Sequence, residues 1–318
     1  MTHRRKQHPP HLALVRRVDL GETTLTPKAV DRRTSDEIVS LYTAAVVYGI
    51  GTGTWIAIGA GSGQSNPGTA TYVVPPILLT AASVGGIALA DSQHVFRYGG
   101  AQSVVSGLYI GIEEGAIWTI VDESINDNHT NMSPPLAATV VWGAATAGAI
   151  GGGILGGLHA TTPGRASFVG SAALWSSVLS GSVAGAFGGN KEGAVGPFTV
   201  AGIGLNVGLV GGLVLSEPFS PTIARVRFLD LGGASGYLVG LGFYEAGANN
   251  KTNAQAALGS GAIGSAVGLA SSWLLTRSMQ DDRLGGRHSE PSTLGSLTPT
   301  VLPLDHGAAF GIHGTLYE

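Results

Sequence analysis

Small residues recur at every fourth position in eight long apolar stretches, and this pattern limits what the chain can fold into. The stretches cover residues 39–60, 71–90, 99–121, 136–158, 166–188, 198–215, 226–244 and 255–275. Each is close to the ~20 residues that a helix needs to cross the hydrocarbon core of a bilayer. Transmembrane strands need only about 10 residues with strict alternation, which these stretches lack. We therefore predict an all-α membrane protein with about eight transmembrane helices.

On a helix, positions i and i+4 share a face, so each stretch presents a stripe of small side chains. Such stripes let membrane helices approach each other closely. The second stretch carries Ala82, Gly86 and Ala90. The stripes of later stretches include Gly107 and Gly111, Gly181 and Gly185, Gly204 and Gly208, Gly232 and Gly236, and Gly264 and Gly268. We expect most of these glycines to pack helices together within the chain. Because eight stripes exceed what pairing of neighbours requires, we also expect a homo-oligomer or contacts with other subunits of a membrane complex.

The composition supports a chain whose main partner is the lipid bilayer. Charged residues make up only 12% of the chain, about half of the ~25% usual in soluble domains. Glycine accounts for 51 of the 318 residues, more than twice its ordinary share of about 7%. The net charge of −3 and the lack of a basic patch interleaved with aromatic residues argue against nucleic acid as a partner. The chain has no cysteine, which excludes disulfides and cysteine-ligated metals.

The stretches form pairs that repeat along the chain. The odd-numbered stretches begin near 39, 99, 166 and 226, and arginines lie close to the start of three of them, at Arg97, Arg165 and Arg225. This spacing predicts four helical-hairpin repeats over residues 39–277. A polar, basic tail (1–38) precedes them, and a flexible linker (278–296) follows.

The last segment, 297–318, differs in pattern. Phe310 and Ile312 alternate with small residues after a glycine-containing turn, which predicts a short β-hairpin. Because an isolated hairpin is marginally stable in water, we expect it to dock on the bundle or pair with residues 12–20.

Basic residues predict the orientation of the bundle. With an even number of spans, both tails and the loops between hairpins share one side, here called the tail side; the loops within hairpins form the turn side. Fifteen of the 17 Lys and Arg residues fall on the tail side, which the positive-inside rule places in the cytoplasm. We favour an inner or plasma membrane. An outer envelope membrane is the alternative, because helices rich in Gly, Ala, Ser and Thr insert less readily than leucine-rich ones.

Carboxylates inside a membrane span are costly and are functional-site hypotheses. Glu113 and Glu114 lie well inside the third stretch, and Asn206 lies in the middle of the sixth. One interpretation is a proton or cation path; the other is a polar lock that joins helices, with Asn206, Tyr109 or a backbone carbonyl as partner. Asp230 we expect to form an interfacial salt bridge with Arg227.

No pattern in the chain indicates an enzyme, a catalytic residue, a metal site or a cofactor. No histidines pair at i and i+4 on a helix, and no glycine-rich string follows a strand and opens a helix, as a phosphate-binding loop requires. We therefore predict a structural or assembly component of a membrane complex that self-associates through its glycine-zipper faces. The alternative is a small-solute or ion transporter or channel that uses the intramembrane carboxylates.

The last two stretches carry a resemblance. They read ARVRFLDLGGASGYLVGLGFYEAG and AALGSGAIGSAVGLASSWLLTRSM. The pattern of Arg-x-Arg, an acidic residue, Gly-Gly-x-x-Gly and a second glycine-rich helix ending in Leu-Thr-Arg resembles an uncharacterised glycine-zipper-rich membrane domain of predatory and social proteobacteria. The resemblance implies a location in the cell envelope and no known activity, and it assigns no catalytic residue.

Overall fold

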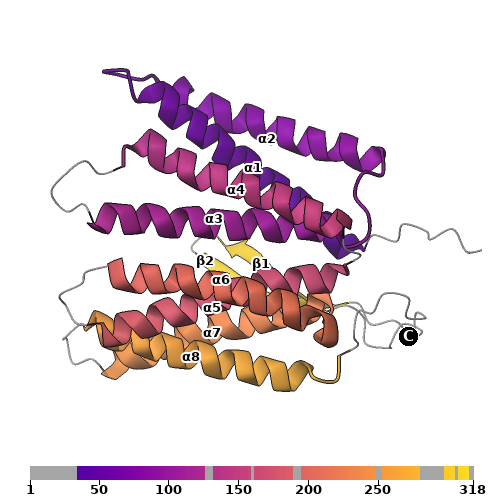
Figure 1. Cartoon of the computed structure of the whole chain (residues 1–318), viewed down its shortest axis with the longest axis vertical. Helices are drawn as coiled ribbons and strands as arrows, with labels where there is room; N and C mark the ends of the chain where they lie inside the picture. The colour runs from indigo at the N-terminus through magenta and orange to yellow at the C-terminus, as the bar shows by residue number, and fades with distance from the viewer. Residues whose placement is uncertain are drawn as a thin grey trace, which may run out of the picture. The chain divides into compact units, whose positions relative to one another are not determined.

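The structure, a computed structural model, contains eight helices that pair into four hairpins (Figure 1). It describes residues 34–125, 132–158, 161–188, 195–247 and 253–279, and the backbone of 297–304 and 307–314. The helices are α1 (Ser35–Gly61), α2 (Thr69–Ser92), α3 (Gly100–Ile125), α4 (Pro134–Leu158), α5 (Pro163–Phe187), α6 (Val195–Phe219), α7 (Ile223–Gly247) and α8 (Ala254–Thr276). The predicted all-α membrane fold is confirmed.

Local capping sets where the helices begin. The Thr34 hydroxyl accepts a hydrogen bond from the backbone N–H of Glu37 at 3.2 Å, and the Thr162 hydroxyl accepts one from Arg165 at 3.2 Å. Pro134 and Pro163 occupy the first positions of α4 and α5, where a missing N–H costs little. With Thr34 as its cap, α1 includes residues 35–38, which precede the predicted apolar stretch.

Close backbone contact holds each hairpin together. A Cβ built on Gly107 of α3 would clash with the carbonyl oxygen of Gly148 of α4, and one on Gly236 of α7 would clash with that of Gly264 of α8. Glycine thus allows the backbones of paired helices to touch, and van der Waals contact of this kind drives helix association in lipid. Gly49 of α1 packs in the same way against Thr80 of α2.

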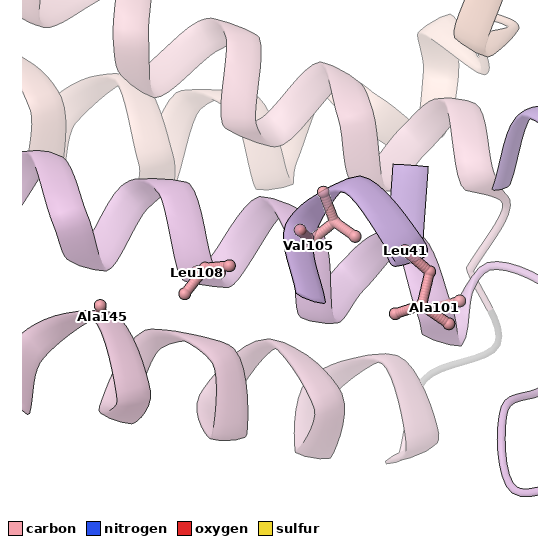
Figure 2. Packing of buried hydrophobic residues seen from close by; sticks show 6 residues of the cluster. Leu41, Ala101, Val105, Leu108 and Ala145 are labelled. Carbon is pink, nitrogen blue, oxygen red and sulfur yellow. The ribbon is translucent and has the colours of Figure 1, made fainter. Parts of the chain in front are cut away.

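Two clusters of buried apolar side chains join neighbouring hairpins. In the first, Leu41 of α1 lies beside Ala101 and Val105 of α3, and Leu108 of α3 faces Ala145 of α4 (Figure 2). The second cluster contains Ile117, Val121, Ala173, Ala201 and Leu205 from α3, α5 and α6. The third hairpin therefore packs on the second through these apolar side chains, and Gly170 and Gly202 also lie against α3 there.

Among the described helices, seven are long and apolar enough to cross a membrane, and α7 is the exception. Its 25 residues match the other helices in length, but Arg225, Arg227 and Asp230 lie in its first turns. Since α7 lies against α8 from Gly232 to Gly240, it reaches the same depth as its partner. Its charged residues lower its hydropathy, and their contacts within the protein are described below.

The C-terminal strands form the predicted hairpin. β1 (Leu297–Leu304) pairs antiparallel with β2 (Gly307–Gly314), in a register that sets Val301 opposite Phe310. Residues 12–20, predicted as a partner strand, lie outside the described residues, as do residues 1–33 of the tail and residues 280–296 of the predicted linker (278–296).

Candidate functional site

The three polar residues singled out in the sequence do not form one site. The Glu114 carboxylate of α3 accepts a hydrogen bond from Trp118 Nε1 at 2.7 Å, and from Asn206 Nδ2 of α6 at 3.3 Å to each oxygen. The Asn206 amide also donates to the carbonyl of Gly202 at 2.9 Å. Glu114 and Asn206 therefore join α3 to α6.

Glu113, the next residue along α3, has a different partner. Its half-buried side chain interacts with the hydroxyl of Ser177 on α5. Consecutive residues of a helix point about 100° apart, so these two carboxylates reach two different helices of the neighbouring hairpin. Together they connect the second hairpin to the third.

Asp230 has an equivalent role between the third hairpin and the fourth. Its carboxylate accepts hydrogen bonds from the Ser171 hydroxyl and, at 2.9 Å, from Trp175 Nε1, both on α5. The predicted salt bridge between Asp230 and Arg227 is therefore wrong. Asp230 lies about 10 Å along the axis of α7 from the first residue of that helix. At this position Ser171 and Trp175 of α5 are within hydrogen-bonding distance.

Arg227 instead closes a set of contacts among the starts of the odd-numbered helices. Its guanidinium binds Asp36 of α1 at 3.2 Å and donates to the Ser40 hydroxyl at 3.1 Å. At the start of α3, the N–H of Gly99 donates to the fully buried Glu37 carboxylate at 2.7 Å. Gly99 has a φ of +78°, a left-handed conformation that favours glycine.

The starts of α3, α5 and α7 meet through glycine. A side chain on Gly99 would clash with the carbonyl of Thr161, and one on Gly164 would clash with that of Pro221. Each of these two carbonyls belongs to the residue just before a threonine that caps the next helix. The Thr162 hydroxyl accepts a hydrogen bond from the N–H of Arg165 in α5, and the Thr222 hydroxyl accepts one from the N–H of Arg225 in α7. The four odd-numbered helices thus begin together on the tail side. The contact between the starts of α3 and α5 and the contact between the starts of α5 and α7 have the same construction.

Side-chain hydrogen bonds between successive odd-numbered helices also recur at a regular interval. The two bonded residues lie 62 positions apart for Glu37 and Gly99, 60 for Ser106 and Ala166, and 59 for Ser171 and Asp230. This interval agrees with the repeat length of about 60 residues seen in the sequence. That the hairpins arose by duplication stays a prediction.

Two further arginines stabilise the tail side. The buried Arg225 guanidinium lies 5.1 Å from the ring centre of Phe219 and 4.9 Å from that of Trp273, within cation–π range. Arg165 donates from Nε and Nη2 to the Ser220 hydroxyl at 3.1 and 2.9 Å, and to the carbonyl of Glu217 at 3.3 Å. Sequence reasoning missed both arrangements, because only the positions of the arginines near helix starts were visible.

Most of the small-residue stripes lie between helices. Gly111 packs on Ala144; Gly181 on Ala201; Gly185 on Leu258; Gly204 and Gly208 on Ser176; Gly232 on Ser272; and Gly268 on Gly232. The stripe of α2 differs. Ala82 and Gly86 are exposed, and among the described residues nothing lies within 4 Å of a Cβ built on Gly86.

The polar side chains described above, Glu113, Glu114, Asn206, Asp230 and Arg227, thus contact residues of other helices. Glu245, near the end of α7, is exposed. Comparisons of the chain with protein-family models, with curated proteins and with solved structures gave no match.

Proposed function

We propose that this chain is a structural or assembly component of a membrane complex, and that copies of it associate through the outward stripe of α2. The proposal includes an inner or plasma membrane as the location, in keeping with the excess of basic residues on the tail side. An outer envelope membrane is the alternative location.

The observation that carries the proposal is the uncovered stripe itself. The helix α2 has no buried residue along its 24 residues. Its partner α1 packs on a different face of it, with Gly49 against Thr80 and Gly53 against Pro76. Ala82 and Gly86 therefore remain exposed, beside large exposed side chains such as Leu78 and Leu89. Small residues flanked by large ones form the shape that permits close approach of a second membrane helix.

The contacts of the carboxylates favour assembly over transport. Glu113 and Glu114 interact with groups on α5 and α6, as a polar lock between helices requires. The cavity between the second and third hairpins, about 820 Å³ in volume, is lined by neither of them. A smaller cavity of about 490 Å³ is lined by Trp118 and Asn206, which donate to Glu114, and not by the two carboxylates themselves.

The absence of cysteine allows a direct test in the membrane. Gly86→Cys places a thiol in the proposed contact, near the two-fold axis that a symmetric dimer would have. We expect an oxidant to convert this variant to a disulfide-linked dimer in native membranes. Gly86→Leu should abolish the dimer in native mass spectrometry of detergent-extracted protein, because the larger side chain prevents close approach.

Gly143 of α4 offers the matched control. It is also an exposed glycine, and among the described residues nothing lies within 4 Å of a Cβ built there. Gly143→Cys should remain uncrosslinked, and Gly143→Leu should leave the oligomer intact. A monomeric wild type, or equal crosslinking of Gly86→Cys and Gly143→Cys, would rule out the α2 interface.

A further inference from the structure

The cavity between the second and third hairpins runs inward from the tail side. At the tail side it is lined by Arg165 and Glu217, which lie two residues from the start of α5 and from the end of α6. At its inner end it is lined by Ile110 and Gly148, each ten residues from the tail-side end of its helix. At 1.5 Å per residue this is a depth of about 15 Å, half of a ~30 Å hydrocarbon core. Measured along the helices, the cavity is therefore about as deep as one leaflet is thick.

The wall of the cavity is apolar over most of this depth. Several glycines of α4 line it, together with leucines of α4 and α6. Gly148 and Gly152 also pack against α3, so the backbone itself forms the wall there. At Gly151, which lines the cavity, nothing among the described residues lies within 4 Å of a built Cβ. The volume of about 820 Å³ is within the roughly 300–1,000 Å³ of small-molecule sites.

The tail-side end presents two opposite charges. The Arg165 guanidinium has five N–H donors, and its bonds to Ser220 and to the carbonyl of Glu217 use Nε and Nη2. As far as the described residues go, Nη1 remains for a ligand oxygen. Glu217 has an exposed side chain, and its carboxylate attracts a cation. A ligand whose headgroup is only anionic would bind the Arg165 guanidinium but would be repelled by the Glu217 carboxylate.

From the depth, the apolar wall and the paired charges, we infer that this cavity binds a phospholipid whose headgroup carries both a phosphate and an ammonium group. The phosphate lies at Arg165 and the ammonium group at Glu217. An acyl chain fills the groove along Gly151 and Leu155, between the two hairpins. The lipid thereby completes packing that side chains of α4 and α6 leave open. This inference is independent of the α2 interface, because the two surfaces share no residue.

The test is native mass spectrometry of the whole protein, released from membranes of equal parts phosphatidylethanolamine and phosphatidylglycerol. Wild type should retain phosphatidylethanolamine in preference to phosphatidylglycerol. Gly151→Leu should lower the bound lipid about tenfold or more, because the new side chain occupies the groove. Gly143→Leu, on the same helix but outside the cavity, should retain lipid as wild type does.

A second variant tests the headgroup and does not depend on the first one folding. Glu217→Gln removes the carboxylate at an exposed position, so the preference for phosphatidylethanolamine should fall about tenfold while total lipid is kept. Equal retention of the two lipids by wild type would mean unspecific annular lipid. That result, the absence of any retained lipid, or equal lipid in Gly151→Leu and Gly143→Leu would each overturn the inference.

Discussion

Hydrogen bonds between hairpins are single contacts that can be removed one at a time. Ser171→Ala deletes the hydroxyl that donates to Asp230 and leaves Trp175 as donor. Interhelical hydrogen bonds in membranes contribute about 0.6 kcal/mol on average and up to about 1.7, so we expect a loss of about 1 kcal/mol in unfolding free energy. Equilibrium unfolding in mixed detergent micelles would measure it.

The control for this variant is Ser167→Ala, one turn earlier on α5, where the described residues show no side-chain hydrogen bond. It should unfold like wild type. If the two variants are equally stable, the contact between Ser171 and Asp230 does not join the hairpins.

For single residues, the sequence predicted which polar side chains lie inside the membrane spans, but it predicted few of their hydrogen-bond partners. Asn206 was one of three partners considered for Glu113 and Glu114, and it bonds to Glu114, whereas Ser177, the partner of Glu113, was not considered. Asp230 was assigned to Arg227 because that arginine is its nearest basic neighbour in the sequence. The true partners come from α5, and no feature of a single sequence states which helix lies beside α7.

Individual helices differ in how much room their glycines have, and α7 contains both extremes. A Cβ on Gly236 would clash with the backbone of Gly264, so Gly236→Ala forces α7 and α8 apart. Overpacking of this kind costs about 1–3 kcal/mol. Gly242, on the same helix, has open space around it among the described residues. Gly242→Ala should therefore stabilise the protein by about 0.5–1 kcal/mol, through the higher helix propensity of alanine.

Thermal unfolding in detergent would compare the two variants. Opposite signs are expected, and a Gly236→Ala variant as stable as Gly242→Ala would show that the backbones of α7 and α8 do not touch.

The helices themselves were predictable, with every end within four residues of the expected stretch, because length and apolarity are local properties. Whether each small-residue stripe packs against another helix or is exposed was not predictable from the sequence. Gly86 on α2 and Gly236 on α7 belong to the same sequence pattern, yet Gly86 is exposed and Gly236 packs against the backbone of α8. The difference depends on which face of α2 meets α1, and that face is set by Gly49 and Gly53 of the partner.

For the molecule as a whole, the hairpin architecture fixes which loops share a side of the membrane, and one labelling experiment can then orient all of them. The loop after α1 and the loop after α2 lie on opposite sides. Gln64 and Gln93 are exposed residues in these two loops. Thr162 would be a poor labelling site, because it is fully buried and its hydroxyl caps α5.

With the tail side in the cytoplasm, Gln64→Cys should react with an impermeant thiol reagent in intact cells, because it lies on the turn side. Gln93→Cys should react only after lysis. The chain has no cysteine of its own, so unlabelled wild type is the blank. Reaction of Gln93→Cys alone in intact cells would reverse the orientation and put the basic tails outside. Reaction of both would mean that α2 does not cross the membrane, and the outward stripe of Ala82 and Gly86 would then face water instead of a second copy.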